Sequence, residues 1–262
     1  MTQDVWASGE AYEAYVGRWS RAVAARFVGW LAVPVGRRWL DVGCGTGALT
    51  ATVLSAAGPA EIVGVDPSTG FLATASARID DPRAAFQPAD ARALPLPDDR
   101  FDAVVSGLVL NFVPEPAEAV AEWARVAAPG AVVAAYVWDY AEGMRFMREF
   151  WDAAIAVDPA AADLDELRRF PMCRPEPLRA LWDGAGLVGV TVTAIEIPTL
   201  FADFADFWRP FLGGQGPAPS YLMSRDEEHR DAIRDLLAQR LPTRAGGSIP
   251  LTARAWAVKG TA

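Results

Sequence analysis

The stretch Trp39-Leu-Asp-Val-Gly-Cys-Gly-Thr-Gly-Ala-Leu-Thr50 decides the fold of this chain. Residues 39–42 form a short apolar run typical of a buried parallel strand. Glycines follow at positions 43, 45 and 47, and a helical run extends from Ala48 to Ala57. Glycine has no Cβ and tolerates positive φ, and the helix that follows presents unpaired N–H groups. A strand, a glycine turn and a helix in this order therefore predict a ligand-binding loop.

The same glycine spacing also satisfies the G-x-G-x-x-G/A fingerprint of dinucleotide-binding folds. Asp41 separates the two interpretations. A carboxylate two residues before the first glycine would repel a pyrophosphate, whereas it would attract an ammonium or sulfonium group. S-adenosylmethionine carries both of these cations and no phosphate, so Asp41 favours it as the ligand.

The element Asp41-Val-Gly43-Cys-Gly45-Thr-Gly47 resembles the E/D-x-G-x-G-x-G motif of class I S-adenosylmethionine-dependent methyltransferases. Within that family, the chain is similar to the group of ubiquinone/menaquinone-biosynthesis C-methyltransferases and many other small-molecule methyltransferases. The resemblance covers Ala11 to Trp138 and says little about Gly143 to Gly247. It implies an α/β fold, with a Rossmann-like, mostly parallel seven-stranded sheet, an antiparallel last strand and helices on both faces.

The composition sets bounds on the other classes of protein. A chain of 262 residues, 52% of them hydrophobic, can form one large α/β domain. The resemblance implies that residues 1–262 form a single methyltransferase domain. No apolar run is long enough to span a membrane and no secretory signal is present, so we expect a cytoplasmic protein without a membrane partner. The net charge of −9 argues against a nucleic-acid partner. Two cysteines and one histidine predict no metal site.

Hydrophobic periodicity places the remaining elements. Beyond the first strand we expect strands at 61–66, 84–87, 102–106, 131–137, 187–197 and 248–258. We expect helices at 69–79, 115–126, 175–185 and 224–240, and a helical pattern over 143–175. The segments 143–175 and 198–247 look like cap insertions, with Phe201, Phe204, Phe207, Trp208 and Phe211 on one helical face.

The resemblance implies further cofactor contacts downstream of the glycines. Asp66, followed by Pro67, ends the second strand about 20 residues past the loop, where a ribose-binding carboxylate belongs. Ser68 is placed to cap the next helix, which leaves Asp66 free for the sugar. Asp90 and Ala91 match the family pattern that binds adenine. Ser106 and Gly107, at the end of the fourth strand, are expected to border the methionine part of the cofactor.

The N-terminal segment Tyr15-Val-Gly-Arg-Trp-Ser20 lies in a predicted lid helix over residues 11–31. It resembles a pattern of related methyltransferases in which this helix closes over the cofactor. Tyr15, Arg18, Trp19 and Ser20 are therefore candidate cofactor contacts. The alternative is a helix that only packs against the domain, with a break near Gly17.

Four residues are candidate contacts for the methyl acceptor: Asn111, Trp138, Tyr140 and Trp151. Asn111 follows the fourth strand at the switch point of the sheet, although it is equally suited to cap the next helix. The three aromatic residues either line a pocket or belong to the core.

Methyl transfer needs mainly alignment and exclusion of water, so a general base is optional and the sequence assigns none. Cys44 in the loop and His229 on a charged helix are given no catalytic role. Two other functions stay open: an NAD(P)-dependent oxidoreductase that uses residues 43–48 as a dinucleotide loop, and a non-catalytic S-adenosylmethionine-binding protein.

Overall fold

The computed structural model of the chain describes residues 17–213 and 216–262. These residues form two compact units. The first, here called the sheet unit, comprises residues 20–137, 172–195 and 255–262. The second, the helical unit, comprises the described part of residues 1–19 together with residues 138–171 and 196–254. The two segments predicted to be cap insertions fall almost entirely within the helical unit.

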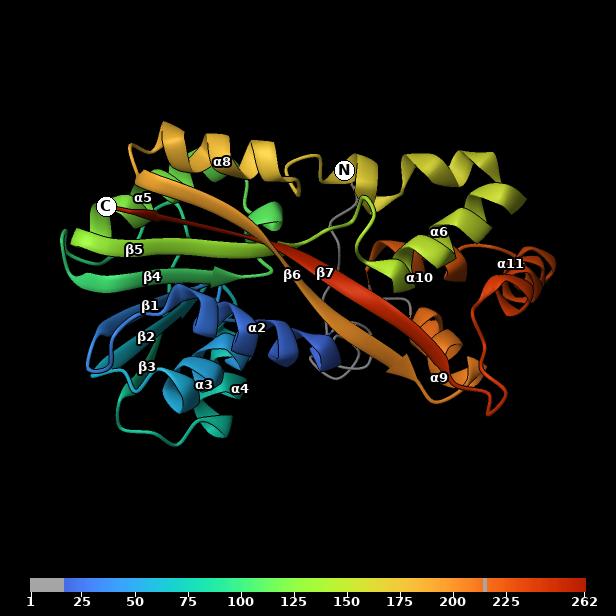
Figure 1. Cartoon of the computed structure of the whole chain (residues 1–262), viewed down its shortest axis with the longest axis horizontal. Helices are drawn as coiled ribbons and strands as arrows, with labels where there is room; N and C mark the ends of the chain where they lie inside the picture. Colours follow the sequence, from blue (N-terminus) through green and yellow to red (C-terminus); the bar gives the residue numbers. More distant parts are fainter. Residues whose placement is uncertain (1–16, 214–215) are drawn as a thin grey trace. The chain divides into compact units, whose positions relative to one another are not determined.

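The described strands form one seven-stranded sheet in the order β3-β2-β1-β4-β5-β7-β6, drawn in Figure 1. Their bounds are β1 Arg38–Val42, β2 Glu61–Asp66, β3 Ala84–Pro88, β4 Phe101–Gly107, β5 Ala127–Trp138, β6 Val188–Phe201 and β7 Ile249–Thr261. β1 pairs in parallel with β2 on one side and with β4 on the other. β3 and β5 extend the parallel arrangement outward. Strand order reverses between β1 and β4, which creates the switch point at which open α/β sheets bind ligands.

The last strand runs against the others. Gly130 donates its N–H to the carbonyl of Ala262 near the start of β5, whereas Asp139, just beyond the end of β5, donates to Arg254. Residue numbers along β7 thus fall as those along β5 rise. The predicted mostly parallel sheet with an antiparallel last strand is confirmed.

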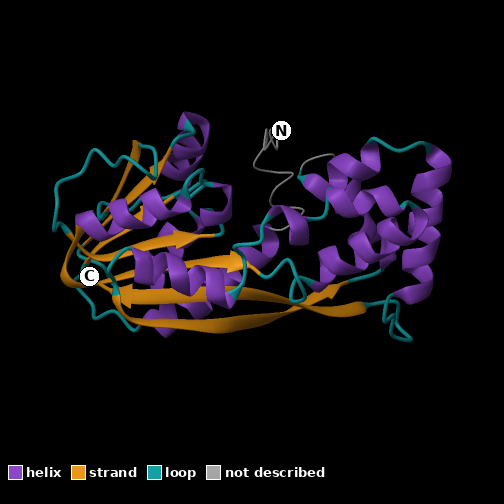
Figure 2. Ribbon diagram, turned by 90° about the horizontal axis from the view of Figure 1, so that it is seen from above, coloured by secondary structure: helices purple, strands orange, loops and turns teal. Residues whose placement is uncertain are grey.

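Helices lie on both faces of the sheet in the sheet unit (Figure 2). They are α2 Arg18–Leu31, whose first two residues belong to the helical unit, α3 Ala48–Ala56, α4 Thr69–Arg78, η2 Leu110–Phe112, α5 Pro116–Val126 and α8 Pro175–Gly184. α5 and α8 lie side by side, with the rings of Trp123 and Trp182 6.3 Å apart. The Trp182 indole N–H also donates to the carbonyl of Val133 at 2.8 Å, so α8 is attached directly to β5.

Short helices make up most of the helical unit. They are α6 Arg145–Val157, η3 Pro159–Asp163, α7 Glu166–Arg169, α9 Phe204–Trp208, η4 Arg209–Gly213, α10 Pro217–Met223 and α11 Glu227–Arg240. In the described parts of the chain, no helix is at once long enough and apolar enough to cross a bilayer.

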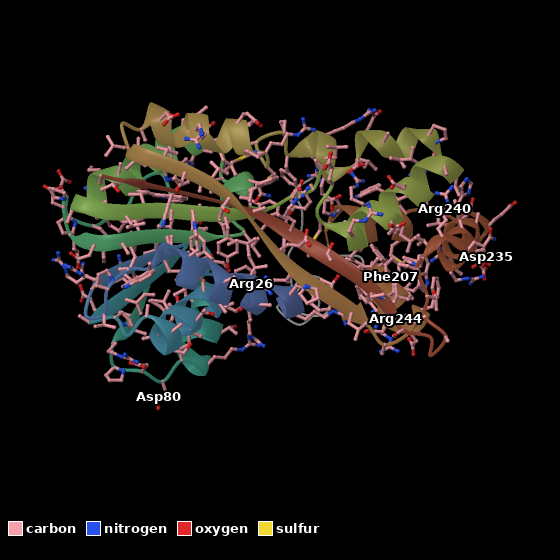
Figure 3. All side chains as sticks on the ribbon, viewed as in Figure 1. Arg26, Asp80, Phe207, Asp235, Arg240 and Arg244 are labelled. Carbon is pink, nitrogen blue, oxygen red and sulfur yellow. The ribbon has the colours of Figure 1, made fainter. Side chains whose placement is uncertain are left out.

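Aromatic side chains fill the interior of the helical unit. Phe150 and Phe211 stack with their ring centroids 4.4 Å apart, and Phe146 contacts Phe201, Phe207 and Phe211. All five rings are buried. Phe207 lies within this cluster, whereas the charged side chains of Asp235 and Arg240 project from α11 (Figure 3). These phenylalanines are therefore core residues.

The predicted elements that differ from the structure include one helix and one strand. The helical pattern expected over 143–175 is broken, because α6 ends at Val157 and Asp158 with Pro159 starts a separate turn. Phe201 was placed with Phe204 and Phe207 on one helical face, but it ends β6, which continues four residues beyond the expected limit at Ile197.

Candidate functional site

The glycine loop joins β1 to α3 at the switch point. Gly43, Gly45 and Gly47 have φ values of 72°, 52° and 87°, all in the left-handed region that disfavours other residues. A Cβ on Gly43 would lie 2.5 Å from a methyl of Val109, and one on Gly47 would lie 2.6 Å from a methyl of Ile79. A Cβ on Gly45 would meet nothing within 4 Å. The outer glycines are thus required for packing, and the space beside Gly45 is open.

Asp66 links the end of β2 to this loop. Its Oδ2 accepts the N–H of Gly45 at 3.0 Å, and its Oδ1 accepts the N–H of Ser68 at 2.8 Å. Ser68 caps α4 by accepting from Phe71, as predicted. The Asp66 carboxylate, expected to be free, therefore has one partner on each oxygen. Each oxygen retains a lone pair for a further donor, and burial raises the pKa of this carboxyl above its usual value.

Asp41 is enclosed within the sheet unit and has no exposed surface. Its Oδ2 accepts a hydrogen bond from the Thr50 hydroxyl at 2.7 Å, whereas its Oδ1 is buried and has no partner in the described part of the chain. Burial raises the pKa of Asp41 to about 7, and the bond from Thr50 opposes that rise. The carboxylate expected to attract the cationic groups of the cofactor is therefore fully buried and bonded to α3.

Asp90 and Ala91 follow β3 in an irregular turn. The Asp90 carboxylate forms a two-pronged ion pair with Arg92, at 3.1 Å to Nε and 2.8 Å to Nη2. This bond lowers the pKa of Asp90 to about 2, so the group is charged at neutral pH. Arg92 also bonds Glu115 at 2.6 Å, and the carbonyl of Ala91 accepts the Trp123 indole N–H.

Two buried polar side chains, Ser106 and Asn111, lie at and just beyond the carboxyl end of β4. The Ser106 hydroxyl is fully buried and has no hydrogen-bond partner among the described residues. Asn111 is 8% exposed, and no described residue bonds its Oδ1 or its Nδ2. Between them, Gly107 leaves no room for a side chain because the Tyr136 hydroxyl would lie 2.6 Å from its Cβ. Asn111 does not cap α5, because the residue at that position is Glu115.

The predicted lid residues divide between the units. Arg18 and Trp19 belong to the helical unit, Ser20 is a buried residue of the sheet unit, and Tyr15 lies outside the described residues. Arg18 forms an ion pair with Asp206 at 2.9 Å, and its guanidinium lies 4.4 Å from the Trp19 ring centroid and 4.5 Å from that of Phe201.

The three aromatic acceptor candidates also lie in the helical unit. Trp138 is 3% exposed with an unpaired indole N–H, and Tyr140 packs against Phe170 with ring centroids 5.4 Å apart. Trp151 is fully buried, and its indole N–H donates to Glu166. The surroundings of Trp151 are therefore those of a core residue.

A buried charged cluster surrounds Trp151. Arg148 and Asp165 form an ion pair at 2.7 Å, with both side chains almost inaccessible. Glu166 is 1% exposed, and its Oε1 has no partner. Burial raises the pKa of Glu166 to about 7. The apolar pattern of α6 predicted this burial, but it gave no sign of the charged groups enclosed with it.

The two residues excluded from catalysis have unreactive surroundings. Cys44 is buried, and burial raises the pKa of its thiol. His229 lies on the exposed first turn of α11 with its Nδ1 2.7 Å from Asp226. Among residues 17–213 and 216–262, no three His, Cys, Asp or Glu side chains are grouped as metal ligands.

The sheet unit thus collects Asp41, the glycine loop and Asp66 at the carboxyl ends of β1 and β2, next to β4. Sequence reasoning missed three residues that shape this region: Thr50, Arg92 and Val109. Only Thr50 could have been found from the sequence, because it is a polar residue in the first turn of the helix that follows the loop.

Comparisons with known proteins agree with this geometry. Residues 40–135 match the model of the methyltransferase domain family. The demethylmenaquinone methyltransferase of Renibacterium salmoninarum is 40% identical over 50% of this chain and 49% of its own length. The trans-aconitate 2-methyltransferase of Methylobacterium radiotolerans is 36% identical over 53% of this chain and 55% of its own length. The chain therefore spans about half the length of these curated relatives.

A solved structure shows the same fold. Phosphoethanolamine N-methyltransferase 2 of Haemonchus contortus, in complex with S-adenosyl-L-methionine, superposes with a TM-score of 0.58 and 18% identity, over 96% of this chain and 56% of that one. The matched segment, residues 40–135, contains the glycine loop, Asp66, Asp90 and the end of β4. This segment of the chain is similar to the methyltransferase domain family, and the chain has the fold of an S-adenosyl-L-methionine-binding methyltransferase.

Proposed function

We propose that this protein transfers a methyl group from S-adenosylmethionine to a small-molecule acceptor. The observation that carries the proposal is the bond between Asp66 and Gly45. It brings the carboxylate expected to bind the ribose to the loop expected to carry the rest of the cofactor, beside the open space at Gly45.

The residues of the sheet unit suit this cofactor. The Asp66 carboxylate has lone pairs left for the ribose hydroxyls, and Asp90 is a charged acceptor suited to the adenine amino group. Asp41 places a buried acid beneath the loop, which favours a cationic ligand over a pyrophosphate. Backbone at Ser106 and Gly107 would border the methionine part, and Arg18, Trp19, Ser20 and Tyr15 remain candidates for closing over it.

When bound, the cofactor supplies a methyl group already activated by a sulfonium. The acceptor contributes the electron pair that forms the new bond to carbon, the electrons of the broken carbon–sulfur bond stay on sulfur, and the proton that a neutral acceptor loses is released to solvent. The work left to the protein is to hold the acceptor in line and to exclude water. No described residue has to act as a nucleophile in this scheme.

A second set of residues is proposed to contact the acceptor. A quinone-like acceptor is supported by the similarity to demethylmenaquinone methyltransferases. Asn111 is the best-placed polar contact, because it follows β4 at the switch point and no described residue bonds its amide. Trp138 and Tyr140 are further candidates.

Calorimetry with S-adenosylhomocysteine and with NAD⁺ tests the proposal. We expect micromolar binding of S-adenosylhomocysteine and no measurable binding of NAD⁺. Methyl transfer from labelled S-adenosylmethionine to a panel of quinols, phenols and organic acids then separates an enzyme from a binding protein. Binding of NAD⁺ in place of the sulfur compound would overturn the assignment.

A further inference from the structure

Asn111 is the only asparagine among the 262 residues, and its surroundings are unusual for an amide. It is 8% exposed, and within residues 17–213 and 216–262 neither its oxygen nor its nitrogen, both closed off from solvent, has a hydrogen-bond partner. In a buried amide without partners, the unsatisfied donor and the unsatisfied acceptor each lower the stability of the folded state. Such a residue in a native fold calls for a ligand that supplies both partners.

The backbone around Asn111 is held in a strained conformation. Leu108, three residues before it, has a φ of 62°, in the left-handed region that branched side chains avoid. Its N–H donates to the carbonyl of Tyr136 at 2.8 Å, which ties this turn to β5. The strained residue follows the carboxyl end of β4, next to the switch point where the strand order reverses.

The turn that contains Leu108 and Val109 packs against the glycine loop. The methyls of Val109 occupy the space that a Cβ on Gly43 would need, 2.5 Å away at the closest. The 3-10 turn η2 that carries Asn111 is therefore fixed beside the cofactor loop within one unit. Because Val109 packs on the glycine loop, a group bound by Asn111 would lie close to the cofactor.

The chemistry of the amide restricts what it binds. Nδ2 donates and Oδ1 accepts, so full pairing requires a neutral group with an acceptor and a donor side by side. A carboxylate would pair with Nδ2 and face Oδ1 with a second acceptor. A quaternary ammonium would pair with neither atom.

The neighbours of Asn111 in the chain are apolar. Leu108 and Leu110 are buried, and Phe112 is 40% exposed. We infer that Asn111 recognises an acceptor with an apolar, aromatic body and an uncharged donor–acceptor group, such as a hydroxy-carbonyl, a quinol hydroxyl or an amide. This inference rests on the proposed function, and it favours a quinol over a tricarboxylate as the methyl acceptor.

Two matched probes test the chemical class on the full chain saturated with S-adenosylhomocysteine. They are 1-naphthamide, which offers a donor and an acceptor, and 1-naphthoate, an anion of the same shape that offers acceptors only. We expect the wild type to bind the amide at least tenfold more tightly. Asn111→Leu should remove that preference and leave the affinity for S-adenosylhomocysteine within twofold. Equal binding of both probes to the wild type would overturn the chemical class.

The single asparagine also permits a direct observation. Selective ¹⁵N labelling of asparagine side chains gives one NH₂ pair in the spectrum, and that pair should shift when 1-naphthamide is added. An unmoved signal in the presence of bound 1-naphthamide would overturn the contact.

A stability measurement separates recognition from a structural role. If the amide is unpaired in the free protein, Asn111→Leu should raise Tm, because it removes two buried polar atoms without partners. Gln239→Leu, at an exposed amide on α11, is the control and should leave Tm unchanged. A fall in Tm for Asn111→Leu would show that the amide supports the fold and would overturn the inference. Failure of S-adenosylhomocysteine to bind the wild type would instead overturn the proposed function.

Discussion

The hydroxyl of Thr50 donates a hydrogen bond to the carboxyl of Asp41 at 2.7 Å, and both side chains are fully buried. This bond attaches the first turn of α3 to β1 directly beneath the glycine loop. The other oxygen of Asp41 lies in a region of low dielectric, and none of the residues that the structure describes bonds it. The result is a carboxyl with a pKa of about 7, so its charge depends on what binds above it.

Cofactor affinity should therefore depend on pH. A cationic ligand stabilises the charged form of Asp41, so binding improves as the free protein loses this proton. With a pKa near 7, the ionised fraction rises about tenfold between pH 6 and pH 8. The Kd for S-adenosylhomocysteine, which keeps the ammonium group of the cofactor, should fall by about the same factor. Calorimetry in buffers of different ionisation enthalpy should detect proton release near pH 7.

Asp41→Asn is the control for this linkage. The variant should bind more weakly than the wild type at pH 8, and its Kd should not change between pH 6 and pH 8. A slope that persists in Asp41→Asn would assign the pH dependence to another group.

The loop glycines should separate stability from binding. Gly43→Ala places a Cβ against Val109 at positive φ, and we expect it to lower the free energy of unfolding by about 2–4 kcal/mol. Val109→Ala in the same chain should recover about 1 kcal/mol of this loss. Urea denaturation of the four members of the cycle measures the coupling, and additive effects would contradict the contact.

Gly45→Ala is the change to compare with Gly43→Ala, because it adds the same methyl group where the loop leaves open space. Its Cβ meets nothing within 4 Å, so only the left-handed backbone should cost stability, by about 1 kcal/mol. The new methyl should nevertheless weaken S-adenosylhomocysteine binding at least tenfold, because it occupies the space assigned to the cofactor. Unchanged affinity would place the cofactor elsewhere.

The sequence predicted the parts of the fold and site that depend on local patterns. The loop, the strand that ends at Asp66 and the capping by Ser68 each follow from residues close together in the chain. The ion pair between Arg92 and Glu115 joins residues 23 positions apart. Helix and strand patterns relate only residues a few positions apart, so they cannot predict this pair. The packing of Val109 on Gly43 depends on the pairing of β1 with β4. This pairing is set by the order of all the strands in the sheet, and no single stretch of sequence predicts it.

The helical unit was harder to predict for a different reason. Burial of Trp151 follows from the apolar spacing of α6, but its partner Glu166 lies on a four-residue helix with no periodicity of its own. Acidic residues are almost never fully buried unless paired, so a composition-based expectation places Glu166 on the surface. The enclosure of Arg148, Asp165 and Glu166 became visible only in three dimensions.

Asp66 should contribute to cofactor binding through its charge. Asp66→Ala removes the acceptor for the ribose hydroxyls, and a lost hydrogen bond to a charged group costs about 1.5–3 kcal/mol, or roughly tenfold to hundredfold in Kd. Asp81→Ala is a close control, because Asp81 likewise accepts the N–H of the residue two positions ahead. We expect Asp81→Ala to leave the Kd for S-adenosylhomocysteine within twofold, and similar losses in both variants would contradict the ribose assignment.

Glu166 should make the stability of the protein fall as pH rises. Its folded pKa of about 7 lies above the ordinary value near 4.5, so between these values the folded state holds a proton that the unfolded state has released. The stability associated with this proton is complete below pH 4.5 and is lost as pH rises through 7. From pH 5.5 to pH 8 the loss should be about 2 kcal/mol.

Glu166→Gln isolates this contribution, because glutamine still accepts from the Trp151 indole and does not ionise. Asp41 titrates in the same direction, so the quantity to measure is the difference between wild type and variant, by urea denaturation at pH 5.5 and pH 8. The variant should gain about 2 kcal/mol relative to wild type over that interval, whereas Glu227→Gln, at an exposed site on α11, should gain nothing. Parallel pH profiles for wild type and Glu166→Gln would mean that Glu166 is already ionised in the folded protein, with Arg148 as the nearest cation able to stabilise it.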